Sequence, residues 1–191
     1  MLRSLVGSEM CIRDRKRALK LLRVRTQKEA DILAGDLKAL NDSRKDMTEE
    51  AVKLAKEQVE TTDLSDDRVL VIYLPDCHES LVGIVAGRIK EEYHHPVIVF
   101  CPVGDGLVKG SGRSIESYHM FEKLMACKDL MVRFGGHKMA AGMTLHEKDL
   151  PELERRLNAE AGLTQADFVP ELWIDVATVS YTHLTLPTKL E

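Results

Sequence analysis

The spacing of hydrophobic residues changes near residue 67, and this change divides the chain into two regions. Between residues 26 and 60, apolar side chains recur every three or four positions, as at Leu33, Leu37 and Leu40, and no proline intervenes. This spacing predicts amphipathic helix, with a bend at 41–43 because Asn, Asp and Ser favour caps and turns. Since the region also carries many charges, we expect a connecting element rather than a core.

After residue 67, short apolar runs alternate with helical patterns. Val69–Leu74 and Pro96–Cys101 are continuous and rich in β-branched residues, which is typical of strands buried on both faces. The helical spacing of 81–92 lies between them, so we expect a parallel strand pair joined by a right-handed crossover. The predicted fold class is α/β, a mixed β-sheet flanked by helices and preceded by a long connecting helix. Further strands are predicted at 107–114, 140–145 and 173–176, and helices at 118–127 and 150–161.

The composition is that of a soluble globular protein. The chain has 191 residues, of which 44% are hydrophobic and 30% are charged, enough for one domain and an appendage. No apolar run approaches the roughly 18 residues that span a bilayer, which excludes an integral membrane protein. Four cysteines without a C-x-x-C pair favour free thiols in a reducing cytosol, so we expect a cytoplasmic protein.

The two ends of the chain are related to each other through the genetic code. One codon choice for Met10–Arg15 has a reverse complement that encodes Val179–His183. Such an inverted repeat is similar to a translated sequencing adaptor, so we expect 1–15 and 179–191 to be non-native tails that pack poorly. The interior begins and stops abruptly, so we expect a fragment of a longer protein.

Two glycine-rich segments are the best candidates for chemistry. In KGSGRS, Lys109–Ser114, alternation along a strand places Ser111 and Arg113 on one face, where a hydroxyl and a guanidinium can hold a phosphate. The alternative is a hairpin turn with a solvated arginine. In FGGHKMAAG, Phe134–Gly142, we expect a tight glycine turn that presents His137 to a ligand. The alternative there is a histidine packed among small residues.

Other polar clusters predict no metal site. His94 and His95 are expected to form a surface pair that closes a helix, and Cys77–Glu79 is too short for three ligands to converge on one ion.

Charge is divided unevenly along the chain. Residues 28–68 include 7 basic and 12 acidic residues, whereas residues 88–138 include 8 basic and 6 acidic ones. The local excess of positive charge favours a phosphodiester ligand near the glycine-rich segments.

Three segments, in this order, resemble one family. HESLVGIVAGRIKEEYHHPVIVF, KGSGRSIESYHMFEKL and RFGGHKMAAGMTL together are similar to the RecJ family of single-stranded-DNA-specific exonucleases, in the DHH phosphoesterase superfamily. The resemblance implies a catalytic domain that uses Mn or Mg, a connecting helix and a DHH-associated domain. On this basis, 16–66 is expected to hold the end of the catalytic domain and the connecting helix. Residues 67–163 are expected to form the DHH-associated substrate-binding domain, and 164–178 to start a truncated following domain.

The resemblance also implies roles for individual residues. The first glycine-rich segment is expected to contact the 5′-terminal phosphate or the nearby backbone of single-stranded DNA. His137, in the second segment, is expected to position the scissile phosphate. The residues expected to bind nucleic acid are Arg88, Ser111, Gly112, Arg113, Ser114, Gly135, Gly136 and His137.

The sequence departs from the family in one respect: the metal-binding aspartates and the D-H-H motif are absent. We therefore expect this fragment to bind no metal and to be inactive alone, because metal-assisted hydrolysis of a phosphodiester needs those ligands. The parent protein is expected to be a 5′-3′ exonuclease of DNA repair and recombination, whose missing catalytic domain forms the opposite wall of the cleft. One alternative is the substrate-binding domain of another DHH-superfamily phosphodiesterase, acting on nano-RNA or a cyclic dinucleotide. A second is a non-catalytic module that binds single-stranded nucleic acid. A third is a fragment that folds but binds nothing, because its cleft needs the missing domain as the opposite wall.

Overall fold

A computed structural model describes residues 16–61 and 67–170 of the chain. The expected tails at 1–15 and 179–191, and the strand expected at 173–176, lie outside the described residues. Residues 16–23 are helical and precede the first long element. The elements that follow are α2 (Gln27–Glu60), β1 (Leu70–Tyr73), α3 (Val82–Tyr93), β2 (Val97–Gly104), β3 (Leu107–Arg113), α4 (Met120–Ala126), η1 (Lys128–Leu130), β4 (Met131–His137), β5 (Ala140–His146), η2 (Glu147–Asp149), α5 (Leu150–Ala159) and η3 (Gln165–Phe168).

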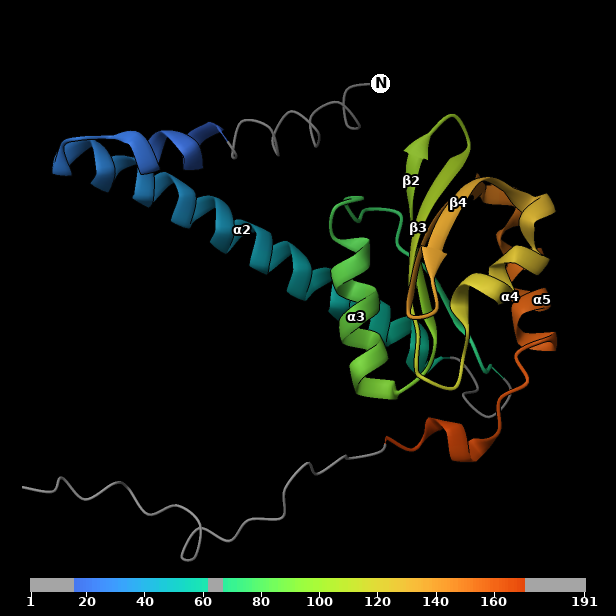
Figure 1. The fold of residues 1–191 in the computed structure, drawn as a ribbon. Coiled ribbons are helices and arrows are strands. Elements are labelled where there is room, and N and C mark those ends of the chain that lie inside the picture. The colour runs from blue at the N-terminus through green and yellow to red at the C-terminus, as the bar shows by residue number, and fades with distance from the viewer. Residues whose placement is uncertain (1–15, 62–66, 171–191) are drawn as a thin grey trace, which may run out of the picture.

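The strands form one mixed sheet of five, in the order β1-β2-β3-β5-β4 (Figure 1). β1 and β2 are parallel and are joined through α3, as the strand–helix–strand pattern predicted. The other three pairs are antiparallel, with β2–β3 and β4–β5 as hairpins. The predicted α/β fold class with a mixed sheet is thereby confirmed.

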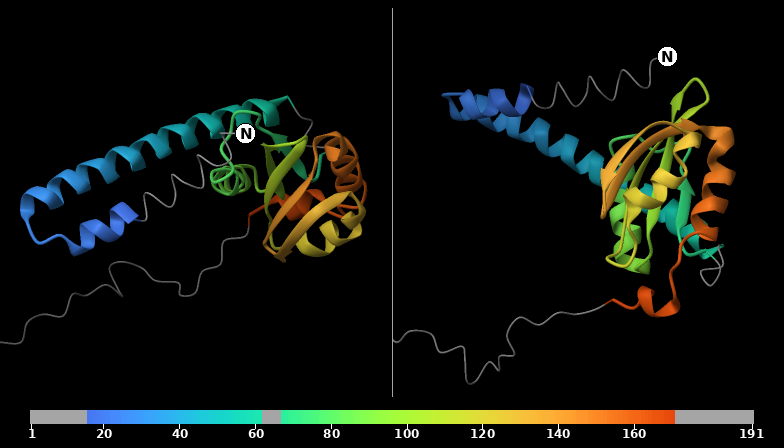
Figure 2. Two further views of the ribbon diagram at one scale, coloured as in Figure 1. Left: turned by 90° about the horizontal axis from the view of Figure 1, so that it is seen from above. Right: turned by 45° about the vertical axis from the view of Figure 1, so that its right-hand side comes forward.

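Helices pack on both faces of this sheet (Figures 1 and 2). One face, here called the sealed face, lies under α4 and α5. Its core includes Ile98 and Phe100 of β2 and Leu145 of β5, all fully buried. The opposite face lies under α3 and the end of α2. Its core is made by alternate residues of β1 and β2 together with the inner sides of α3 and of the end of α2. Strand alternation therefore gives each face its own core.

The long helix α2 runs without a break from Gln27 to Glu60, so the bend expected at 41–43 is wrong. The residues at that point form contacts that suit a continuous helix. Arg44 donates a hydrogen bond to the Asn41 amide oxygen at 3.3 Å, and Lys45 lies 3.8 Å from the Asp42 carboxylate. Helix propensity is a weak prior that such local pairs can override. The last third of α2 also belongs to the core, since Ala51, Val52, Ala55 and Val59 are buried, so only its earlier part is a connecting element.

The segment expected to be a glycine turn is a strand, β4, and the turn is confined to Lys138 and Met139. Phe134 holds this strand in place. It lies opposite Met143 of β5 and its ring stacks on Phe121 of α4, with 5.4 Å between ring centroids. The glycines therefore extend the sheet instead of ending it.

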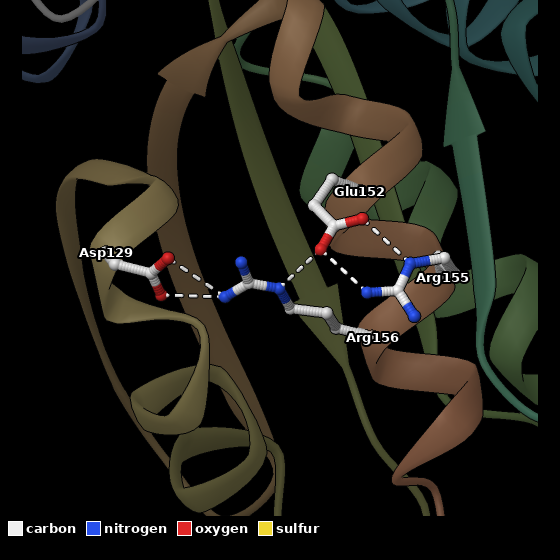
Figure 3. A network of polar contacts seen from close by, with 4 residues as sticks. All are labelled: Asp129, Glu152, Arg155 and Arg156. Atoms are coloured by element: carbon white, nitrogen blue, oxygen red, sulfur yellow. Dashed lines mark hydrogen bonds and ion pairs between the residues drawn. The ribbon is translucent and has the colours of Figure 1, made fainter.

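Polar side chains connect helices to neighbouring elements at two places, the outer edge of β1 and the contact between α5 and η1. At the outer edge of β1, the Asn158 amide accepts a hydrogen bond from the Val69 N–H at 2.8 Å and donates one to the Val69 carbonyl at 3.1 Å. The Gln58 amide donates to the Tyr73 carbonyl at 2.9 Å. On α5, Arg156 contacts both Glu152 and Asp129 of η1, and Arg155 binds Glu152 as well (Figure 3). These contacts attach α5 to η1 and to the outer edge of β1, and α2 to the end of β1.

Candidate nucleic-acid interface

The register of three strands builds a polar surface on the α3 side of the sheet. Directly opposite residues of antiparallel strands point to the same face, and on β3 this face begins beside α3. Beyond α3 it continues over β5 and β4, where Gly142, Gly135 and His137 are exposed. We call this surface the open face. It consists of three cross-strand rows: Arg113–Ala140–His137, Ser111–Gly142–Gly135 and Lys109–Thr144–Arg133.

Arg113 and Ser111 are held together at the border between α3 and the open face. The Arg113 guanidinium donates from Nη1 to the Ser111 hydroxyl at 3.0 Å and to the Gly112 carbonyl at 2.8 Å. A Cβ at Gly83 of α3 would come within 2.9 Å of Arg113 Nη2 and 3.1 Å of Ser111 Oγ, so a glycine there lets the helix pack against this pair. Since a guanidinium has five N–H groups, the bonds from Nη1 leave those of Nη2 and Nε without a hydrogen-bond partner among the described residues. The pair thus places guanidinium N–H groups beside a hydroxyl at this border.

His137 stands at the other end of the same row as Arg113, on the exposed end of β4. Its Nδ1 accepts a hydrogen bond from the backbone N–H of Met139 at 3.3 Å. An accepting Nδ1 places the proton of the neutral ring on Nε2. His137 therefore offers one N–H donor to a ligand on the open face.

Some of the predicted residues serve the fold. Ser114 is buried, and its hydroxyl donates to the Tyr118 carbonyl at 2.7 Å. A Cβ at Gly112 would meet Met120 at 3.2 Å, on the sealed face. A Cβ at Gly136 would clash with the backbone of Ala140. These three residues are therefore needed for packing and do not point to the open face, whereas Gly135 lies on the open face itself.

Arg88 is not brought to the open face. It is exposed on α3, four residues before Glu92, and Glu92 lies 2.7 Å from Lys56 of α2. Residues four apart share one side of a helix, so Arg88 lies on the flank toward α2. Gly83 lies on the other flank, where a Cβ would meet the Arg113 guanidinium.

Sequence reasoning missed the third row and Gly142. Lys109 precedes Ser111 and Arg113 at the same alternation, and Arg133 precedes Gly135 and His137 in the same way. The alternation of polar residues is therefore present in both segments. It predicts the place of Arg133 only once β4 is known to be a strand. In the structure, the Lys109 ammonium lies 2.8 Å from the Glu79 carboxylate, while Arg133 is exposed.

The cluster Cys77–Glu79, considered above for metal binding, makes other interactions in the structure. Burial raises the pKa of the Cys77 thiol to about 11, so it stays protonated, and the His78 ring is 2.7 Å from the Ser80 hydroxyl. Within residues 16–61 and 67–170, no group of three or more His, Cys, Asp or Glu could hold a metal ion. The open face presents cations and hydroxyls, whereas Mg²⁺ and Mn²⁺ prefer carboxylates. The described residues therefore do not fit such a metal.

The expectation of a surface pair at His94 and His95 is half wrong. His94 does end α3, in a left-handed conformation with φ of 52°. His95 is buried instead, with 6% of its surface exposed, and its ring stacks on Phe168 at 3.9 Å between centroids. Its Nδ1 bonds to the Tyr93 carbonyl at 2.6 Å, so a proton on Nδ1 holds the ring in place.

Comparison with known proteins places this geometry in a family. The DHHA1 domain family matches residues 66–162. The single-stranded-DNA-specific exonuclease RecJ of Salmonella typhimurium is 45% identical over 136 residues, which cover 67% of this chain and 23% of that protein. RecJ of Bacillus subtilis is 38% identical over 162 residues, which cover 83% of this chain and 20% of that protein. This chain thus spans less than a quarter of the length of these relatives.

Two solved structures share the fold. RecJ from Thermus thermophilus, in complex with Mg²⁺, has a TM-score of 0.65 and 33% identity, over 76% of this chain and 22% of that one. An exonuclease RecJ bound to manganese has a TM-score of 0.68 and 32% identity, over 80% of this chain and 37% of that one. No helix within the described residues combines the length and apolarity needed to cross a bilayer. The match across residues 66–162 establishes that the chain belongs to the DHHA1 domain family and is similar, within it, to RecJ proteins.

Proposed function

We propose that this chain is the substrate-binding part of a cytoplasmic exonuclease that degrades single-stranded DNA from the 5′ end during DNA repair and recombination. In this proposal residues 67–163 are the DHH-associated domain, 16–66 contain the connecting helix and 164–178 begin a following domain. The similarity to RecJ proteins over most of the chain supports it. The proposed ligand is the sugar–phosphate backbone, including the 5′-terminal phosphate.

The observation that carries the proposal is the convergence of Ser111, Arg113 and His137 on the open face. They come from two strands with β5 between them, and the residue of β5 in the same row as Arg113 and His137 is the small Ala140. None of the strand positions in the three rows carries a carboxylate. An anion on this surface therefore meets donors on both sides without repulsion from the strands themselves.

Hydrolysis is assigned to the missing part of the protein. RecJ structures similar to this chain contain Mg²⁺ or manganese, and in the proposed enzyme the same ions would activate water. The described residues of this chain supply no ligand set for them. We therefore propose that the chain binds DNA without cleaving it, and that the catalytic domain forms the opposite wall of the cleft.

The test is a titration of the full chain against a labelled single strand, followed by fluorescence anisotropy. Strands with a 5′-phosphate and with a 5′-hydroxyl are compared, each with wild type and with Arg113→Ala. A charge-assisted hydrogen bond contributes about 1.5–3 kcal/mol, so the variant should weaken binding of the phosphorylated strand by roughly 10- to 100-fold. It should also abolish the preference for the 5′-phosphate.

Arg155→Ala is the matched control, because it removes the same charge from α5, on the sealed side of the sheet. It should leave the affinity unchanged. Equal affinity of wild type for the two strands would show that Ser111 and Arg113 do not hold a terminal phosphate.

A further inference from the structure

The third row of the open face, made by Lys109, Thr144 and Arg133, has no role in the site proposed above. Its three side chains point to the same face as Arg113 and His137, since Lys109 pairs with Thr144 and Thr144 with Arg133. Phe134, the next residue of β4, lies opposite Met143 of the sealed core, which confirms the alternation. The row therefore places a hydroxyl between two cations.

The two cationic rows are four residues apart along the strands. At about 3.3 Å per residue, this separation is roughly 13 Å. The row between them contains Ser111 at one end and Gly142 and Gly135 beyond it. A strip of bare backbone thus lies between two sets of donors.

The fold does not require glycine at the two positions of this strip. A Cβ at Gly135 or Gly142 would meet no atom within 4 Å, and neither residue has a positive φ. Gly110 differs, because a Cβ there would clash with the Phe100 ring. A glycine that packing does not demand lowers the stability of a strand, and in strands such glycines often mark the close approach of a ligand.

The charges of the third row are unequal. Arg133 forms no ion pair within the described residues, whereas Lys109 is paired with Glu79 at 2.8 Å. Glu79 lies in the turn before α3, not on the sheet. The carboxylate offsets the charge of Lys109 but leaves two of its N–H donors for another acceptor.

We propose that the third row binds a second backbone phosphate of the same DNA strand, further along the strand than the phosphate held at Ser111 and Arg113. The nucleotides between the two phosphates cross the bare strip of Gly135 and Gly142. This inference rests on the proposed function and adds to it the length of DNA that the open face contacts. Glu79 weakens the second contact, because it competes with the phosphate for Lys109.

The experiment uses 5′-phosphorylated oligothymidylates of one to four nucleotides as unlabelled competitors of a labelled strand bound to the full chain. Arg113→Ala should weaken every competitor. Arg133→Ala should leave the mononucleotide unchanged and weaken the longer competitors by roughly tenfold, the effect of one charge-assisted contact. The salt dependence of binding by the labelled strand should fall by about 0.7 in logarithmic slope.

Glu79→Gln is the opposite test, because it frees Lys109. It should strengthen the longer competitors by about two- to fivefold, the effect of a surface charge pair. Glu92→Gln, which removes the partner of Lys56 between α2 and α3, is its control and should change nothing.

The outcomes separate the two proposals. If Arg133→Ala has no effect, or weakens the mononucleotide as much as the longer competitors, the second phosphate site is refuted while the site at Arg113 stands. If Glu79→Gln leaves every competitor unchanged, Lys109 takes no part and the three-residue row is refuted. If no strand binds the wild-type chain at all, the proposed function fails and this inference fails with it.

Discussion

The two faces of the sheet are built from the same strands and have opposite characters. On β3, Val108, Gly110 and Gly112 point into the sealed core under α4, while Lys109, Ser111 and Arg113 point to the α3 side. The space around the glycines differs between the two faces. Gly110 and Gly112 make room for Phe100 and Met120, whereas Gly142 has empty space above it. One alternating strand can therefore satisfy packing on one side and present polar side chains on the other.

The largest effect is expected for a substitution on the sealed face. Leu145 of β5 is fully buried under the helices, so Leu145→Ala should lower the free energy of unfolding by about 2–5 kcal/mol. Denaturant unfolding measures this, and the affinity of the remaining folded protein for DNA should be unchanged. A cost below about 1 kcal/mol would show that this face is not closely packed.

The two classes of glycine give the sharpest contrast. Gly110→Ala forces a methyl group against Phe100 and should destabilise the fold by about 1–3 kcal/mol, as overpacking does. Gly142→Ala places the same group in open space and should leave stability unchanged or slightly higher, while it weakens DNA binding. Thermal unfolding and anisotropy of both variants measure this. Gly35→Ala, at another open position on α2, is the control for binding.

The buried histidine predicts a pH dependence away from the open face. Burial lowers the pKa of His95 below its usual 6.5; the hydrogen bond with the Tyr93 carbonyl acts against this, and the nearby His94 and Arg68 lower the pKa further. A group with a depressed pKa in the folded state stabilises the fold above pH 6.5, and this contribution is lost as pH falls through the folded pKa. Wild-type Tm should therefore fall on acidification below pH 6.5. His95→Phe keeps the stacking on Phe168 and should reduce that fall; an identical pH profile would exclude His95 as its source.

The smallest effect is expected for the exposed network on α5 (Figure 3). Hydrogen bonds from Arg155 and then Arg156 lower the pKa of Glu152 to about 2. The carboxylate thus stabilises the fold above about pH 4.5, and this contribution disappears as pH falls toward 2. Glu152→Gln should lower Tm slightly at pH 7 and flatten the Tm profile between pH 4.5 and 2. Because the group is exposed, added salt should reduce the difference.

Most of the fold could be predicted because its strands are either continuous apolar runs or clear alternations. The pairing of Ser111 with Arg113 was also predictable, since it needs only the alternation within one strand. β4 was not, because two adjacent glycines indicate a turn unless the contacts of Phe134 with Phe121 and Met143 are known.

The rest of the candidate site depends on contacts between distant segments. The third row needs the register of three strands, which no local pattern specifies. The place of Arg88 depends on which flank of α3 faces α2, and the pair Lys56–Glu92 marks that flank. The continuity of α2 likewise follows from its packing and local pairs rather than from the turn propensity of residues 41–43.

The two amides at the margin of β1 have a consequence for how the molecule meets its neighbours. In a parallel pair, alternate residues of the outer strand turn their backbone groups away from the sheet, and Asn158 and Gln58 occupy those groups at Val69 and Tyr73. They take hydrogen-bonding positions that a sixth strand would use. At the other margin, β4 has a bulge near Met131 and carries Arg133 and His137. Both features discourage edge-to-edge aggregation. The addition of a further strand is therefore opposed at β1 by side-chain amides and at β4 by a bulge and basic side chains.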